Sequence, residues 1–488
     1  MRLKPFIVTL IALVFLCLST ANAKDIEPDQ KLLYKVVAGD SLYLHVFKPK
    51  AGVIPTAAIV FFFGGGWTGG HPRQFYQQSQ YFASRGILAI SAEYRVKSKH
   101  GTSPFDCVED GKSAIRWVRE HAKTLNVNPT KIVASGGSAG GHVAICTAVI
   151  DGYDNPNENL IISSKPNAVI GYNPVFDTTN KGYGSGKVKG QETVISPCHQ
   201  VKENLPPMLN FHGKEDTTVP FENAERFTKL MQKAGNRCEL VAVDNVGHGF
   251  FNGGFFREGT GDKYFNLTIY ETDVFLAGLG YLMGKPTLSR NLKLLACLGD
   301  SNTERKYPEF LQEELGNAYE VKNFGKGAGT IIDGTYFPYH KTNPYKAALK
   351  FSPDVAVIMF GTNDANPKWC LNKERETEYE GTVQEEFRFR YTKLINDFKT
   401  KNPNVEICIL TPLPVWASKK PENENLKGRK EQLNKWVIPT IKDIAKKQNL
   451  RLIDIHRLMR NKEQYSTDGI HMNSEGYNLL AKRIAKKM

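Results

Sequence analysis

Short apolar runs alternate with amphipathic segments along the first half of the chain. Helical patterns occupy residues 106–125 and 268–284. The apolar runs are "AAIVFFFGGGW" (57–67), "GILAISAEYR" (86–95), "KIVASGGSAGG" (131–141), "PMLNFHG" (207–213) and "CELVAVDNVGHGF" (238–250). Buried strands separated by helices are typical of a parallel sheet that is covered on both faces, so we predict a three-layer α/β/α unit.

The alternation restarts after the polar stretch "KPTLSRN", which contains Pro286. Further helical segments separate the apolar runs that follow, at 292–299, 319–325, 354–361, 406–414 and 450–456. This series predicts a second three-layer α/β/α unit of about 200 residues, which is close to the usual size of a domain.

The chain length agrees with two domains. Its 488 residues, of which 41% are hydrophobic, are enough for more than one core. We therefore assign residues 24–285 to the first α/β domain, 286–291 to a linker and 292–488 to the second α/β domain. Because the linker is short, we expect the two domains to pack together and their interface to close one pocket.

The first 23 residues have the composition of a secretory signal. "MRLKPFIVTLIALVFLCLSTANA" begins with two cations, continues with an apolar stretch and ends with small residues at Ala21 and Ala23. We predict a signal peptide at 1–23 that is cleaved before Lys24, and a secreted or periplasmic protein without stable membrane insertion. A retained membrane anchor is the alternative, although the apolar stretch is short for a bilayer.

Charge and cysteine content narrow the choice of partners and cofactors. The formal charge of +14 comes from lysines spread along the whole chain. This distribution favours a solvated surface over a nucleic-acid-binding groove, and it leaves attraction to an anionic polymer open. Apart from Cys17 in the predicted signal, the cysteines form no CxxC pair and no Cys/His array. We therefore expect no structural zinc site, and disulfide pairing and oligomeric state stay unassigned.

Ser138 lies in the pentapeptide "GGSAG", between an apolar run and the helical segment "GHVAICTAV". A Gly-x-Ser-x-Gly turn presents its serine on a sharp strand-to-helix bend, where the helix N-terminus favours a developing anion. Asp216 follows the run "PMLNFHG", and His248 follows the next run. The order Ser, acid, His is that of a nucleophile, an acid that fixes the imidazole tautomer, and a base. For the pentapeptide alone, a glycine-rich turn with an inert serine is the alternative.

A glycine-rich run, "FFFGGGWTGG", ends the predicted strand that precedes these motifs. Consecutive glycines let backbone amides approach a carbonyl oxygen, as an oxyanion hole requires. Together with the serine, acid and histidine, this run makes residues 30–285 resemble the α/β-hydrolase esterases of the hormone-sensitive-lipase and carbohydrate-esterase kind. The resemblance implies an oxyanion hole formed by Gly65, Gly66 and the amide of Ala139. Such esterases usually begin the glycine run with His, whereas this chain has Phe63.

Ser301 lies in "GDSNT", immediately after the apolar run "LKLLACL". By itself this motif is also compatible with a serine that caps a helix. Downstream come "VKNFGKGAGT", "IMFGTNDAN" and "STDGIHMNSEGY". In this order the four pieces resemble the SGNH, or GDSL-type, hydrolases of flavodoxin-like fold over residues 292–488, and the resemblance implies that Ser301 is the nucleophile and His471 its base. Asp468, three residues before the histidine, has a spacing that can bring its carboxylate back to the other imidazole nitrogen.

The same resemblance implies three oxyanion donors in the second domain. They are the amide of Ser301, a backbone amide of the "GKGAG" loop and the side-chain amide of Asn363. We name Gly327 as the loop donor, with Ala328 and Gly329 as alternatives. Asn363 follows an apolar run, which favours the amide role over that of a turn residue.

Other titratable residues near these motifs have different interpretations. Glu215 is the alternative orienting acid of the first domain. We interpret Asp110 as a helix charge, Glu93 as a buried carboxylate of the scaffold, and His456 as a scaffold residue without the Asp-x-x-His spacing. His340, in a loop with "YFPY", is a candidate to line a pocket.

Both motif sets serve the attack of an alkoxide on an ester carbonyl and the hydrolysis of an acyl-enzyme, and neither needs a metal or other cofactor. We expect a secreted bifunctional serine esterase with two independent Ser-His-Asp sites. The resemblance implies an acylated polysaccharide or oligosaccharide substrate, with removal of O-acetyl groups from xylan or pectin. The alternatives are feruloyl esterase activity in one half, lipase or peptidase activity in the first half, a non-catalytic carbohydrate-binding or scaffolding half, and action on the organism's own acylated glycans.

Overall fold

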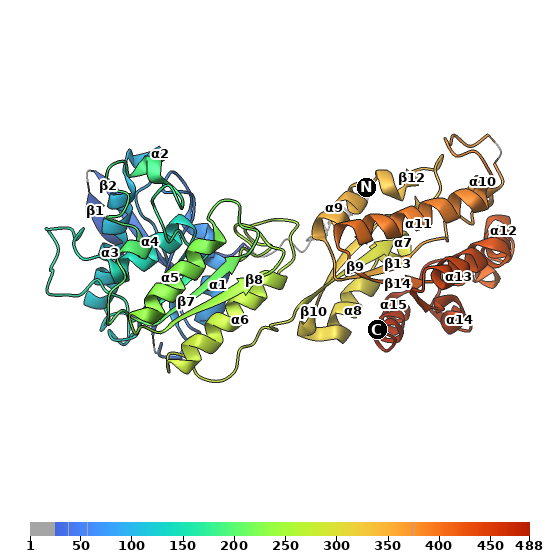
Figure 1. Ribbon diagram of the computed structural model, residues 1–488. Coiled ribbons are helices and arrows are strands. Elements are labelled where there is room, and N and C mark those ends of the chain that lie inside the picture. The colour runs from blue at the N-terminus through green and yellow to red at the C-terminus, as the bar shows by residue number, and fades with distance from the viewer. Residues whose placement is uncertain (1–24, 38, 56, 373) are drawn as a thin grey trace, which may run out of the picture.

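Two α/β domains follow one another along the chain, coloured blue to green and yellow to red in Figure 1. The structure, a computed structural model, describes residues 25–37, 39–55, 57–372 and 374–488. The signal peptide predicted at 1–23 therefore lies outside the described residues. Within the described ranges, no helix is long and apolar enough to cross a membrane. The cysteines of these ranges are all buried and unpaired.

The first domain is built on a sheet with the strand order β1-β2-β4-β3-β5-β6-β7-β8. The strands are β1 (Gln30–Val37), β2 (Asp40–Phe47), β3 (Ala58–Phe62), β4 (Leu88–Ala92), β5 (Ile132–Gly137), β6 (Ala168–Tyr172), β7 (Met208–Gly213) and β8 (Cys238–Val243). The helices are α1 (Tyr76–Ser84), α2 (Lys97–His100), α3 (Pro104–Glu120), α4 (Ala139–Val149), α5 (Phe221–Lys233) and α6 (Lys263–Gly278).

This sheet is mixed, whereas the sequence pattern predicted a parallel one. Strands β3 to β8 pair in parallel, but β2 pairs antiparallel with both β1 and β4. Sequence analysis missed β1 and β2, and it also missed β6. Strand β1 carries exposed or half-exposed residues over much of its length, so it does not stand out as an apolar run. Strand β6 is as long and as buried as β3 and β4, and no structural feature explains why it was missed.

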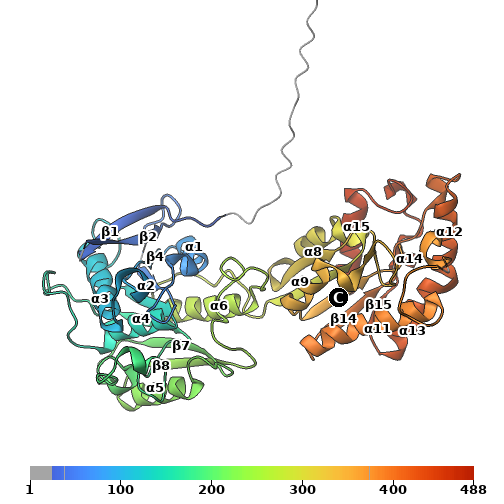
Figure 2. The same ribbon diagram turned by 90° about the horizontal axis from the view of Figure 1, so that it is seen from above.

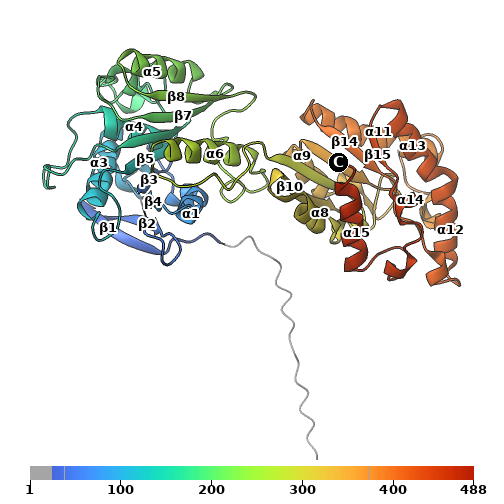
Figure 3. The ribbon, with the colours of Figure 1, turned by 90° about the horizontal axis from the view of Figure 1, so that it is seen from below.

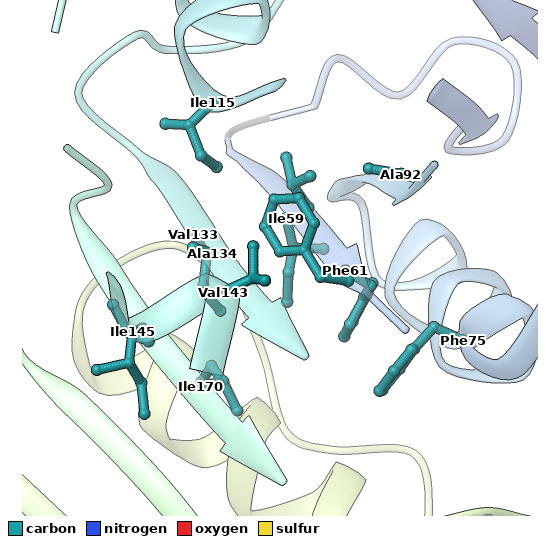
Figure 4. Close-up of a cluster of buried hydrophobic side chains, with 14 of the residues drawn as sticks. Ile59, Phe61, Phe75, Ala92, Ile115, Val133, Ala134, Val143, Ile145 and Ile170 are labelled. Carbon is teal, nitrogen blue, oxygen red and sulfur yellow. The ribbon is translucent and has the colours of Figure 1, made fainter. Parts of the chain in front are cut away.

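Alternate side chains of β3 reach opposite faces of the sheet, which explains the three layers. The Phe61 ring stacks on Phe75 and Phe82, at centroid distances of 5.1 and 6.2 Å, on the face that α1 covers. The Phe62 ring lies on the other face, against Gly111 of α3. Figure 4 shows this core, with Phe75 on one side of β3 and Ile115 of α3 on the other. Because both faces of the strand are buried, the run is continuously apolar.

The second domain has a parallel sheet with the strand order β10-β9-β13-β14-β15. Its strands are β9 (Lys293–Gly299), β10 (Tyr319–Gly325), β13 (Val355–Met359), β14 (Glu406–Leu410) and β15 (Arg451–Ile453), and a separate pair is formed by β11 (Gly329–Thr330) and β12 (Phe337–Pro338). The helices are α7 (Ser301–Glu304), α8 (Tyr307–Leu315), α9 (Asn343–Phe351), α10 (Pro367–Cys370), α11 (Val383–Lys401), α12 (Glu424–Gln432), α13 (Ile438–Lys447), α14 (Ile455–Met459) and α15 (Ser474–Ala485).

The side chains of β9 also alternate between two cores. Leu294, Ala296 and Leu298 belong to the core under α9, α11 and α13, whereas Leu295 and Cys297 belong to the core under α8 and α15. All five side chains are buried. The second domain is therefore the three-layer unit that its apolar runs predicted.

The segment predicted as a linker, 286–291, lies against the first domain. The amide of Thr287 donates to Tyr81 Oη at 3.3 Å, and Arg290 forms an ion pair with Glu271 of α6. Because of these contacts, residues 286–291 are attached to the first domain and do not form an extended linker between the two domains.

Polar contacts join the two domains. Lys263 Nζ, at the start of α6, lies 2.6 Å from Asp354 Oδ1, and the amide of Asp262 donates to Glu320 Oε2 at 2.6 Å. Burial raises the pKa of the Glu320 carboxyl. In Figures 2 and 3, β10, α8 and α9 lie on the side of the second domain that faces the first. The domains thus pack together, as the short connection predicted.

Candidate active sites

Ser138 lies on the turn between β5 and α4. Its backbone has φ +54° and ψ −122°, which is an unusual conformation for a residue with a side chain. The turn is tight: a Cβ atom on Gly140 would lie 2.1 Å from the carbonyl oxygen of Phe62, and one on Gly136 would lie 2.5 Å from Gly140. Gly136 and Gly140 of "GGSAG" are therefore required by close backbone approach, as the motif predicted.

The three residues predicted as the first catalytic set meet at this turn. Ser138 Oγ lies 2.9 Å from His248 Nε2, and His248 Nδ1 lies 2.7 Å from Asp216 Oδ2. Glu215, the alternative acid, is exposed. Asp216 rather than Glu215 therefore contacts the imidazole.

The Asp216 carboxylate is buried and accepts several hydrogen bonds. It accepts hydrogen bonds from the amide of Val219 at 2.9 Å and from Asn173 Nδ2 at 2.7 Å, and His212 Nε2 lies 3.3 Å away. Burial raises the pKa of Asp216, but hydrogen bonds from His212 and His248 outweigh it and hold the pKa well below its usual value. The carboxylate is thus ionised at neutral pH and fixes the proton of His248 on Nδ1.

The predicted oxyanion loop lies against the nucleophile. A Cβ on Gly64 would lie 3.2 Å from Ser138 Cβ. Gly65 and Gly66 adopt φ +133° and +60°, and within the described part of the chain their amides donate no hydrogen bond. Ala139 begins α4, so its amide has no partner within the helix. These three amides are free to bind an oxyanion.

Two residues that contact this loop, Tyr94 and Lys187, were not recognised as its partners from the sequence. Phe63, which replaces the usual histidine, is buried with its ring stacked 4.3 Å from Tyr94, and Tyr94 Oη donates to the Phe63 carbonyl at 2.6 Å. Lys187 Nζ donates to the Gly66 carbonyl at 2.6 Å. An apolar and a cationic contact therefore hold the glycine loop, and no sequence signal linked Lys187 to a residue 121 positions away.

The second predicted set also meets in space. Ser301 Oγ, at the start of α7, lies 2.8 Å from His471 Nε2, and His471 Nδ1 lies 2.7 Å from Asp468 Oδ2. Asp468 Oδ1 accepts hydrogen bonds from the amides of His471 and Ile470 at 2.8 and 3.0 Å. Burial raises the pKa of Asp468, but the hydrogen bonds to His471 outweigh it and lower the pKa. His456, the competing histidine, lies on α14 and takes no part in this arrangement.

The "GKGAG" loop offers fewer donors than the sequence allowed. The amide of Gly329 donates to the carbonyl of Lys326 at 2.8 Å, so it is not available to an oxyanion. Gly327 and Ala328 stay open as the loop donor, and Ala328 adopts φ +56°, a conformation that favours glycine. Asn363 Nδ2 donates to the Gly329 carbonyl at 3.2 Å, which places the predicted side-chain amide against this loop.

Arg429 of α12 orients that amide, and sequence analysis missed it. Its Nη1 donates to Asn363 Oδ1 and to the carbonyl of Thr362, both at 3.3 Å, and its Nη2 donates to Asn425 Oδ1 at 3.1 Å. The arginine is buried, and burial lowers the pKa of its guanidinium. Because a guanidinium only donates, it holds the oxygen of Asn363 and turns the NH₂ group toward the loop.

Comparisons with known proteins identify the families of the two domains. Residues 44–231 match the BD-FAE family, and residues 297–479 match the GDSL-like Lipase/Acylhydrolase family. The chain is 32% identical over 456 residues to an acetylxylan esterase of Xylanibacter ruminicola, covering 88% of this chain and 89% of that protein. The chain belongs to the family of this esterase. It is a carboxylic ester hydrolase in which an α/β-hydrolase esterase domain precedes a GDSL domain.

The first domain of this esterase also resembles solved structures. The apo form of Thermogutta terrifontis esterase 2 is 44% identical, with a TM-score of 0.50, over 54% of this chain and 98% of that chain. The propionate-bound form of the same enzyme gives the same identity, TM-score and coverage. The predicted fold class of two α/β domains, an α/β-hydrolase followed by a GDSL domain, is confirmed.

Two buried carboxyls flank the second site of the esterase. Asp364, next to Asn363, accepts hydrogen bonds on Oδ1 from the amides of Ile331 and Ile332 at 2.8 and 3.0 Å. Burial, with a contribution from the charge of Asp300, raises the pKa of Asp364 to about 7. Burial also raises the pKa of Asp300, the residue before the predicted nucleophile. Asp364 therefore carries a proton in weakly acid solution.

The remaining singled-out residues belong to the scaffold. Asp110 is not a simple helix charge: it is fully buried and paired with Lys35 Nζ at 2.6 Å and Arg95 Nε at 2.8 Å. Glu93 is a hydrogen-bonded carboxylate, which accepts from the amide of Tyr43 at 3.0 Å. His340 lines a cavity of about 30 Å³ in the second domain.

Proposed function

We propose that this esterase is an exported bifunctional enzyme that removes O-acetyl groups from xylan-type polysaccharides, with one hydrolytic site in each domain. The observation that carries the proposal is that each domain holds a complete, hydrogen-bonded Ser-His-Asp set. The name of the acetylxylan esterase relative supports an acetylated xylan as substrate. The propionate-bound relative supports a short acyl group at the first site.

In the first site, Ser138 Oγ donates its proton to His248 Nε2 and attacks the ester carbonyl. The amides of Gly65, Gly66 and Ala139 stabilise the oxyanion, and donors of this kind contribute about 3 to 4 kcal/mol each to the transition state. His248 then protonates the leaving oxygen of the sugar. Water, activated by the same imidazole, releases acetate from the acyl-enzyme.

The second site performs the same steps with a different construction. Ser301 is the nucleophile, and a single loop supplies both its base, His471, and the orienting acid, Asp468. The oxyanion is bound by the amide of Ser301, a backbone amide of the glycine loop and the Asn363 side chain. Since the two sites differ in their donors and walls, we propose that they prefer different acetyl positions or acyl groups.

Export is part of the proposal and rests on the sequence of residues 1–23. Expression with the native N-terminus in a Gram-negative host, followed by N-terminal sequencing, is expected to give a mature chain that begins at Lys24. A protein that stays in the cytoplasm with Met1 intact contradicts export.

Serine substitutions test the two hydrolytic sites. Acetate release from acetylated xylan and acetylated pectin, and ferulate release from a feruloylated oligosaccharide, are measured for Ser138→Ala, Ser301→Ala and the double variant. Each single variant is expected to lose a different part of the products and the double variant to lose all of them. Full activity in the double variant would overturn the proposal. A serine that is dispensable on every substrate would make its domain a non-catalytic module.

A further inference from the structure

A cleft of about 810 Å³ lies between the two domains and reaches His248. Cavities of this size are typical of ligand sites. The first domain contributes the loop of residues 245–250, and the second contributes the C-terminal ends of α9 and α11, including residues 350–352 and 401–404. Figures 2 and 3 show α9 on the side of the second domain that faces α6. The second domain therefore forms one wall of a cavity beside the catalytic histidine of the first.

The chemistry of ester hydrolysis indicates which part of a substrate lies there. The imidazole that deprotonates the serine later protonates the leaving oxygen, so the alcohol half of the ester lies beside the histidine. In a glycan ester the alcohol half is the sugar. The carbonyl oxygen of the ester points instead toward the amides of Gly65 and Gly66. Because the lining of the cleft includes His248 but neither Ser138 nor the oxyanion loop, we assign the cleft to the sugar side of the first site, and this step rests on the proposed function.

The walls of the cleft carry excess positive charge. Arg257, Lys263, Lys350 and Lys401 line it, and Asp354 is the acid among its lining residues. Asp354 is already paired with Lys263 at 2.6 Å. Among the carboxylates of the described residues, none forms an ion pair with the other three cations. Lys350 Nζ donates to the Glu258 carbonyl at 3.1 Å, which does not neutralise its charge. The three cations therefore leave the cleft with positive charge that no carboxylate balances.

The arginine is close to the catalytic loop itself. A Cβ on Gly249 would lie 2.4 Å from Arg257 Nη2, so the guanidinium packs against the residue that follows His248. Guanidinium and ammonium groups are the usual partners of carboxylates, and Arg can bind one through two parallel hydrogen bonds. We propose that the interdomain cleft binds a carboxylate-bearing sugar, a uronate, in the glycan whose ester Ser138 cleaves.

Charge removal from the second-domain wall tests this assignment. The full chain with Ser301→Ala, which isolates the first site, is assayed on acetylated xylo-oligosaccharides with and without a glucuronate branch. We expect the KM of the branched substrate to be about tenfold lower than that of the neutral one, as two to three partly exposed ion pairs allow. When Lys350→Gln and Lys401→Gln are added to the Ser301→Ala chain, the ratio of the two KM values is expected to come close to one.

Lys346→Gln is the matched control, because Lys346 is exposed on α9 but does not line the cleft. It is expected to keep the tenfold ratio. A ratio that survives in the Lys350→Gln/Lys401→Gln protein, or that the control abolishes equally, overturns the uronate site.

Direct binding separates this inference from the proposed function. Calorimetry with the Ser138→Ala/Ser301→Ala protein and a deacetylated glucuronate-branched xylo-oligosaccharide is expected to show binding that the two lysine changes weaken about tenfold. If the oligosaccharide binds but the parent chain hydrolyses no substrate, the uronate site in the cleft is supported and the proposed function is rejected. If the parent chain hydrolyses the substrate but the oligosaccharide does not bind, only the uronate site is rejected.

Discussion

Asp364 makes the stability of the second domain depend on pH. Its pKa is about 7 in the folded protein, compared with 3.8 for an unperturbed aspartate, because the carboxyl is buried near Asp300. Between these two values the folded state keeps a proton that the unfolded state has lost. The free energy of unfolding therefore falls as pH rises through this window and levels off above the folded pKa. The perturbation that tests this is Asp364→Asn.

The magnitude follows from the two pKa values. At about 1.4 kcal/mol per pH unit, the difference between 3.8 and about 7 corresponds to roughly 4 kcal/mol, of which most is lost between pH 5 and pH 8. Asparagine keeps an oxygen for the amides of Ile331 and Ile332 but cannot ionise. Its NH₂ group replaces Oδ2, which lacks a partner among the described residues. That substitution costs about 1 to 3 kcal/mol at every pH, so the pH-dependent difference isolates the ionisation.

The protein is titrated with urea at pH 5 and pH 8, and hydrogen exchange is measured in peptides from β13 and β14. Because these strands belong to the second domain, the measurement gives the unfolding free energy of that domain alone. We expect the wild-type value to fall by about 2 to 4 kcal/mol between the two pH values and the Asp364→Asn value to change much less. Asp443→Asn, on the surface of α13, is the control and is expected to keep the wild-type slope. An equal change in wild type and Asp364→Asn would refute the reasoning, because Asp364 would then not titrate between pH 5 and pH 8.

Three further substitutions test the catalytic geometry and its supports. Asp216→Asn is expected to lower kcat of the first site about 10⁴-fold, because it favours the wrong tautomer of the His248 imidazole. The measurement uses a Ser301→Ala background, so that only the first site contributes. A fall of less than tenfold contradicts the role assigned to Asp216. Arg429→Met is expected to lower kcat of the second site about tenfold with KM nearly unchanged, and to add nothing in an Asn363→Ala background. Independent, multiplicative losses would show that the arginine does not act through the amide. Tyr94→Phe removes the donor to the Phe63 carbonyl and is expected to cost about 1 kcal/mol of first-domain stability by urea unfolding, and an unchanged free energy contradicts that contact.

The sequence by itself predicted which residues meet at both candidate sites. "GGSAG" predicts its turn because only glycine allows the close approach at Gly140. Asp468 and His471 are three residues apart, so their contact is set by one short loop. The order of strands and motifs placed Ser138, Asp216 and His248 at one sheet edge, since parallel strands deliver their carboxyl ends to the same side. These features depend on local geometry and on the alternation of buried and exposed positions.

Tertiary structure alone decided which remote side chains support those sites. Lys187 meets Gly66 across 121 residues, and Arg429 meets Asn363 across 66. The basic cleft between the domains likewise has no local signature. The hairpin of β1 and β2 is local, with Val37 paired to Asp40, but the exposed positions of β1 hide it from a search for apolar runs. Contacts of this kind depend on how whole layers pack, and a single lysine or arginine in the sequence looks the same whether it faces water or a catalytic loop. The sequence therefore predicts the serine, histidine and acid residues of each site. Their orientation and the residues around them depend on long-range packing.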